Sequence, residues 1–267
     1  PLALLSMCAG VALGLLEARP AGLLVSAIAG LALALVLLWL RLRRHLTALT
    51  ARGKQALHRA PGGHFEQHFL WLNGLLNIAF LQLPFLLLPW FVDTADIGRF
   101  AVAHKLVNVI TTLLILLSAV YGPRFARAAA MGDGERLRRL LTETQRLSMM
   151  LFLPAWLMLV AGAQPLALLF SLTPDSLLPL LVVLGCGQLA NAATGLSGVL
   201  LSMSGGAAAE FRILALSTIA TVLATCLAAT TGSLSSVALA IAGGIACRNA
   251  LSFAAARRHI NRQMEPS

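Results

Sequence analysis

The sequence is poor in charged residues, which make up only 11% of its 267 positions. Soluble domains carry roughly 25% charged residues, so this composition argues against an ordinary water-soluble domain. The chain also has few cysteines, and all of them (Cys8, Cys186, Cys226 and Cys247) fall inside apolar stretches. Their spacing fits neither a zinc site nor a disulfide framework. We therefore expect no metal site and no cofactor.

Motifs of several enzyme classes are missing as well. There is no GxxxxGK[ST] phosphate-binding loop, which argues against an ATP-driven engine, and no GxSxG nucleophile motif of a hydrolase. His64 and His68 stand four residues apart, but no third ligand accompanies them. The basic segments lack interleaved aromatic residues, so nucleic-acid binding is not expected. These absences favour a transporter over an enzyme.

Long apolar stretches are what the chain has in abundance. About 20 apolar residues suffice to cross a bilayer as a helix, and such stretches lie at 2–16, 21–40, 69–92, 99–121, 147–170, 178–203, 211–231 and 235–256. Because they are continuously apolar rather than alternating, they indicate helices and not a barrel. The sequence predicts an all-α membrane protein, a polytopic transmembrane helix bundle with about eight spans.

The first stretch is shorter than the others. As a helix, residues 2–16 would rise about 22 Å, less than the roughly 30 Å of a hydrocarbon core. The chain also begins at Pro1 rather than at a methionine. We therefore expect an N-terminally truncated chain that lacks upstream spans.

Basic residues are distributed unequally between alternate loops. Loops 17–20, 93–99, 171–177 and 232–234 contain only Arg19 and Arg99. Apart from Lys105 and Arg248, all other lysines and arginines fall in the alternate set, 41–68, 122–146, 204–212 and 257–267. The positive-inside rule places this second set in the cytoplasm. We expect a multi-pass membrane protein with a cytoplasmic C-terminus.

Two of the basic segments have the pattern of amphipathic helices. Residues 41–60 and 135–147 each carry a leucine stripe, which includes Leu137 and Leu141 in the second segment, among arginines. Asp133 is placed to cap the second helix. Both segments are predicted to lie on the anionic inner leaflet, and docking of a partner enzyme is the alternative.

Polar residues inside the spans are candidates for a substrate cavity, because a base in the bilayer is costly. Lys105 and Arg248 lie well inside spans, whereas every acid is assigned to a loop or a span end. The predicted substrate-binding residues are Lys105, Arg248, Asn108, Gln188, Asn191 and His104. A cavity with positive charge and amides suits an anionic ligand. Alternatively, Lys105 snorkels to the interface and the amides bond across helices.

Two stretches resemble a known family. DTADIGRFAVAHKLVNVI fits an outer loop of the type D-x-x-x-[IV]-G-x-[YF]-x-x-A, and LGCGQLANAATGLSGVLLSMSG is similar to a G-Q-x-x-N-x-x-x-G stretch. The matching residues are Asp93, Ile97, Gly98, Phe100 and Ala103 in the first, and Gly187, Gln188, Asn191 and Gly195 in the second. Both patterns are typical of bacterial polysaccharide flippases, the Wzx-type members of the multidrug/oligosaccharidyl-lipid/polysaccharide (MOP) exporter superfamily.

The resemblance implies two six-helix lobes. Residues 1–40 would be the last two helices of the N-terminal lobe, 41–68 a basic cytoplasmic linker, 69–256 the C-terminal lobe and 257–267 a cytoplasmic tail. It further implies flipping of an anionic lipid-linked saccharide, of the undecaprenyl-pyrophosphate type, for assembly of O-antigen, capsule or exopolysaccharide. The expected partners are this lipid, membrane lipids, a polysaccharide polymerase and glycosyltransferases.

Three alternatives stand beside that function. A cation-coupled multidrug exporter of the same superfamily would need buried carboxylates. A non-transporting scaffold would gather glycosyltransferases through the basic helices. A membrane-embedded glycosyltransferase or ligase would have larger polar loops than those seen between these apolar stretches.

Overall fold

A computed structural model describes residues 63–264 of the chain. The chain divides into two compact units, of which the second, His64–Ser267, contains almost all described residues. The predicted spans at 2–16 and 21–40 and the basic segment 41–60 lie outside the described residues. Within residues 63–264 every regular element is a helix.

The described helices are long and apolar. They are α3 (Gly63–Leu87), η1 (Leu88–Trp90), α4 (Thr94–Ala130), α5 (Gly134–Ala161), α6 (Ala163–Leu169), α7 (Pro174–Thr194), α8 (Ser197–Met203), α9 (Ala207–Ala229) and α10 (Leu234–Met264). Six segments within residues 63–264 are long and apolar enough to cross a membrane. They correspond to the six spans predicted between residues 69 and 256, so the predicted all-α polytopic membrane class is confirmed.

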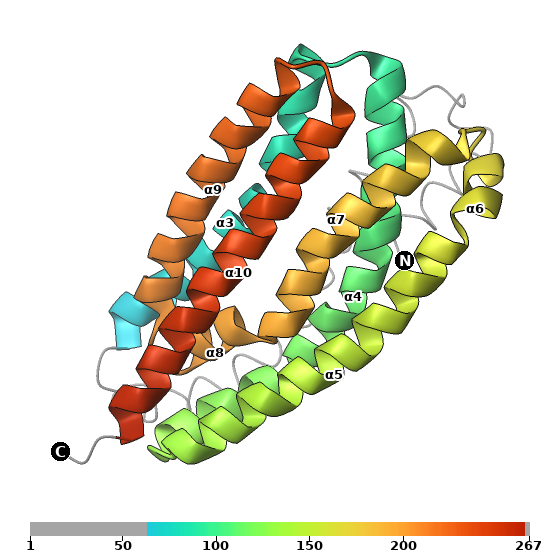
Figure 1. Ribbon diagram of the computed structural model, residues 1–267. Coiled ribbons are helices and arrows are strands. Elements are labelled where there is room, and N and C mark those ends of the chain that lie inside the picture. Colours follow the sequence, from blue (N-terminus) through green and yellow to red (C-terminus); the bar gives the residue numbers. More distant parts are fainter. Residues whose placement is uncertain (1–62, 265–267) are drawn as a thin grey trace, which may run out of the picture. The chain divides into compact units, whose positions relative to one another are not determined.

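The helix α7 lies in the middle of this bundle. It packs against α10 on one side and against α4 and α5 on the other, while α9 runs antiparallel to α10 (Figure 1). Phe100 of α4, Leu181 of α7 and Val237 of α10 are fully buried in the largest apolar cluster. Close van der Waals packing of such side chains holds the helices together, because lipid tails are as apolar as the side chains and burial alone gives no driving force.

The chain breaks between α7 and α8, where the sequence predicted one continuous span over 178–203. Gly195 has a φ of 63°, a left-handed conformation that only glycine adopts without strain. A Cβ at this position would also lie 2.8 Å from the Cγ of Gln145. The break therefore ends α7 at Thr194 and sets the short helix α8 beside α9 and α10.

The segment 135–147 is not a separate helix on the membrane surface, as predicted, but the first half of α5. No glycine or proline interrupts the chain between Glu135 and Leu153, so nothing ends the helix there. Its leucine stripe is covered by protein: Leu137 and Leu141 are buried in a cluster with Phe125 of α4. The predicted cap is confirmed, since the Asp133 carboxylate accepts a hydrogen bond from the Arg136 backbone N–H at 2.8 Å.

Candidate functional site: a charged cavity between four helices

A buried carboxylate stands at the start of α9. The chain turns sharply through Gly205 and Gly206, and α9 begins at Ala207, which places Glu210 in the first turn of the helix. Only 2% of Glu210 is exposed. A negative charge is favoured at this position because the first backbone N–H groups of a helix have no acceptor within the helix.

Two neighbouring helices, α10 and α8, contact this carboxylate. Its Oε1 lies 3.3 Å from Nη2 of Arg248 on α10, and its Oε2 accepts a hydrogen bond from the Ser252 hydroxyl at 2.8 Å. On α8, a Cβ at Gly198 would lie 2.6 Å from Oε1, so any larger residue there would have to displace the carboxylate from its present position. The charge of Glu210 is thus compensated by one cation and one hydroxyl donor.

The sequence reasoning missed the contribution of Glu210. We had assigned it to a loop over 204–212, and we expected the cavity to contain bases without acids. The glycine pair at 205–206 was the available signal, because a tight turn there starts the next helix early enough to include residue 210. Arg248 is therefore not a lone buried base but half of an ion pair.

The ion pair borders a cavity of about 310 Å³. Residues of α3, α8, α9 and α10 line it, with Asn73 and Asn77 of α3 facing the same space as Glu210 and Arg248. The other lining residues are mostly apolar. The volume falls at the small end of the range for ligand pockets, roughly 300–1,000 Å³.

Two polar atoms at this cavity are not satisfied by described residues. Asn73 is 8% exposed and donates a hydrogen bond to the Ala207 carbonyl oxygen at 3.0 Å, but its Oδ1 has no partner. The guanidinium of Arg248 lies 5.3 Å from the centre of the Phe80 ring, and its Nε has no hydrogen-bond partner. Buried polar groups are costly when unpaired, so the packing beside the cavity leaves one donor and one acceptor without a partner among the described residues.

Three of the predicted site residues lie together on α4. Asn108 Nδ2 lies 3.3 Å from His104 Nδ1, and the His104 ring stacks on Phe100 at a centroid distance of 5.9 Å. Lys105 is exposed on the helix surface. None of the three lines the cavity at Arg248.

Two further predicted residues lie on α7. Gln188 is buried, and its Oε1 accepts a hydrogen bond from Asn191 Nδ2 at 3.1 Å. Neither lines the cavity at Arg248. The six predicted residues therefore lie on three different helices, α4, α7 and α10. Among them, only Arg248 of α10 lines this cavity.

The fold and this cavity define a multi-pass, all-α membrane protein with a charged pocket between its helices. Residues 2–173 match the family model described as polysaccharide biosynthesis protein, which is more than half of the chain. The chain belongs to the polysaccharide biosynthesis protein family. No curated protein and no solved structure matches it. The family match ends before α7, so Glu210 and Arg248 lie outside the matched range.

Proposed function

We propose that the protein moves a lipid-linked saccharide from one leaflet of the membrane to the other for assembly of a cell-surface polysaccharide. Its family gives it a role in polysaccharide biosynthesis. Saccharide precursors of such polymers are built on anionic lipid carriers, as the resemblance to flippases implies. A bundle of spanning helices with a cavity that contains a buried charged pair is the kind of structure that such transport requires.

The observation that carries the proposal is the position of Arg248 at the cavity. A guanidinium recognises phosphate oxygens through paired hydrogen bonds, and its Nε is unpartnered in the structure. A phosphate would compete with Glu210, which contacts Arg248 through a single N–O distance of 3.3 Å. The amides of Asn73 and Asn77 at the same cavity are suited to hydrogen bonding with sugar hydroxyls.

Glu210 gives one reason to retain the cation-coupled drug exporter as a second candidate. That function needs a buried carboxylate, and Glu210 supplies one. However, its charge is already balanced by Arg248, so a cationic drug would have to displace an arginine. Because Glu210 partly neutralises Arg248, the pair attracts an anionic ligand less strongly than an unpaired arginine would. It attracts a cationic ligand less strongly still, because the arginine is the more exposed partner.

The proposal is tested by transport in liposomes that contain a labelled diphosphate-linked saccharide, with accessibility measured from outside over time. The double variant Glu210→Gln/Arg248→Gln removes the cation without leaving the acid unpaired. It should slow movement of the lipid at least about tenfold, equivalent to ~1.4 kcal/mol. Arg212→Gln, an exposed base on α9 away from the cavity, is the matched control and should leave the rate unchanged.

Lys105→Gln, alone and combined with the double variant, tests whether the exposed base on α4 contributes. Normal flipping by the triple variant would contradict the proposed role of these bases. Transport of a cationic dye without transport of the lipid would favour the exporter. A protein that moves neither probe would favour the scaffold that gathers glycosyltransferases.

A further inference from the structure

A second charged cleft lies at another place in the bundle, between the first half of α5 and the last turns of α10. It has a volume of about 460 Å³, and most of its surface is polar. Arg138, Thr142 and Gln145 line it from α5, and Arg257 and Asn261 line it from α10. It shares no lining residue with the cavity at Arg248.

The two arginines of this cleft have no acidic partner among the described residues. The arginines that form ion pairs in the described part of the chain are Arg99 and Arg248, and neither lines the cleft. Arg257 lies over the Phe253 ring, 5.6 Å from its centre, which holds the guanidinium at the cleft through a cation–π contact. Two uncompensated guanidinium groups from different helices therefore face one polar space.

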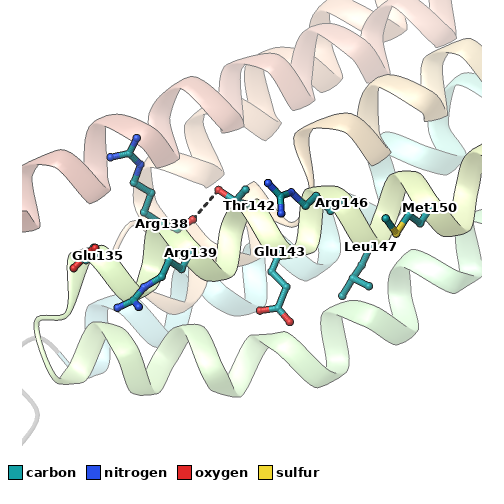
Figure 2. A pocket seen from close by; sticks show the side chains of 8 residues that line it. All are labelled: Glu135, Arg138, Arg139, Thr142, Glu143, Arg146, Leu147 and Met150. Atoms are coloured by element: carbon teal, nitrogen blue, oxygen red, sulfur yellow. Dashed lines mark hydrogen bonds between the residues drawn. The ribbon is translucent and has the colours of Figure 1, made fainter.

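Glu143, which follows the cleft residue Thr142 on α5, is turned away from the cleft. Glu143 accepts a hydrogen bond from the Tyr121 hydroxyl of α4 at 2.6 Å. Figure 2 shows Glu143 pointing toward α4 and Arg138 pointing to the opposite side of α5, toward α10. The neighbouring groove drawn there, of about 550 Å³, has two glutamates among its lining residues. The mixed charge of that groove makes it a poorer anion site than the cleft beside it.

The residues that line the cleft indicate which kind of ligand it can bind. Its inner wall is fixed, because Gln145 donates a hydrogen bond to the Ala193 carbonyl oxygen of α7 at 3.0 Å. Leu141, Phe253 and Ile260 supply the small apolar part of its lining, which is too little to bury an acyl chain. Two arginines and the amide N–H groups of Gln145 and Asn261 match the oxygens of a phosphate group. The Thr142 hydroxyl is not counted among these donors, because it donates its proton to the Arg138 carbonyl oxygen at 3.1 Å.

We propose that the cleft between α5 and α10 binds a phosphate group, with Arg138 and Arg257 as its charged ligands. The source of the phosphate is either the headgroup of an anionic membrane lipid or a soluble phosphate. This site is separate from the cavity at Arg248, so the proposal does not rest on transport. A failure of the flipping experiment would leave it unaffected.

Binding to the purified, detergent-solubilised chain tests the proposal. Native mass spectrometry would compare retention of phosphatidylglycerol with that of zwitterionic phosphatidylcholine, and calorimetry would measure binding of inorganic pyrophosphate. The variant Arg138→Gln/Arg257→Gln should weaken binding of the anionic probe at least about tenfold. The matched control Arg136→Gln/Arg258→Gln changes the same charge on the same two helices outside the cleft and should weaken binding less than about twofold.

The outcomes separate the two sources of phosphate. Preferential binding of phosphatidylglycerol that pyrophosphate does not displace would support a lipid headgroup as the ligand. Binding of pyrophosphate that is lost in Arg138→Gln/Arg257→Gln would support a site open to soluble phosphates. Equal losses in the two double variants, or no binding of either anionic probe, would overturn the proposal.

Discussion

At the scale of single residues, the most constrained feature is the ion pair between Glu210 and Arg248. The carboxylate is 2% exposed and the arginine side chain 17% exposed. Removing two charges from water is costly, and their attraction in the interior only roughly repays that cost. The pair is therefore better understood as a device that fixes the positions of α9 and α10 at the cavity than as a large source of stability.

If the pair mainly fixes positions, losing one charge should lower the free energy of unfolding more than losing both. Arg248→Gln should destabilise the protein by about 3 kcal/mol because it leaves a buried carboxylate without a counter-charge. Glu210→Gln/Arg248→Gln should recover most of that loss. Unfolding of the detergent-solubilised chain, followed by circular dichroism, gives both values, with the exposed Arg212→Gln as the control. If the double variant is as unstable as the sum of the two single ones, the charges do not interact as described.

At the scale of elements, α5 shows how a basic amphipathic segment can belong to the bundle. Its first half carries arginines on the outside, while Leu137 and Leu141 pack between α4 and α10. Gly134 lies against the end of α10, where a Cβ would be 2.7 Å from the Cγ of Met264. The α4–α5 turn therefore packs against the end of α10, next to the cleft between α5 and α10 that we propose as a phosphate site.

Truncating a buried side chain in the first half of α5 should lower the stability of the protein more than truncating an exposed one on the same helix. Leu137 is fully buried, whereas Leu151, further along the same helix, is 42% exposed. Leu137→Ala should cost about 2–5 kcal/mol through lost contacts and a cavity, and Leu151→Ala should cost far less. Denaturation by SDS in mixed micelles measures both. Equal, small losses would instead favour a surface helix that merely rests on the membrane.

The elements also show what the sequence can and cannot predict. The six spans from α3 to α10 were predictable because a run of about 20 apolar residues has one solution in lipid, a helix. The break at Gly195 was not, since it depends on how closely the chain there approaches Gln145 in three dimensions. The continuity of α5 could have been predicted from the lack of glycine and proline between Glu135 and Leu153, but the burial of Leu137 by other helices could not. Arg248 was recognised as a candidate from its depth alone. The glycine pair at 205–206 could have placed Glu210 on the next helix, but its pairing with Arg248 across two helices leaves no trace in a local pattern.

At the scale of the whole described unit, its two ends differ in charge. One end carries the arginines of the α4–α5 turn, of the start of α9 and of the last turns of α10: Arg124, Arg127, Arg136, Arg138, Arg139, Arg212, Arg257, Arg258 and Arg262. At the other end, the Arg99 guanidinium is paired with Asp96 at 2.9 Å, and Asp93 and Asp175 add negative charge. The unit is therefore polarised along its helices, in the way that the positive-inside rule associates with a fixed orientation.

From this polarity we predict that the basic end faces the cytoplasm. In a background without the native cysteines, Thr231→Cys, in the α9–α10 turn, should react with a membrane-impermeant maleimide on intact spheroplasts. Arg262→Cys, near the end of α10, should react only after permeabilisation, and so should Met131→Cys in the α4–α5 turn. Labelling of Arg262→Cys and Met131→Cys in permeabilised cells shows that these cysteines can react when the reagent reaches them. The reverse pattern would place the phosphate cleft outside the cell. Labelling of Arg262→Cys and Thr231→Cys from the same side would mean that α10 does not cross the membrane.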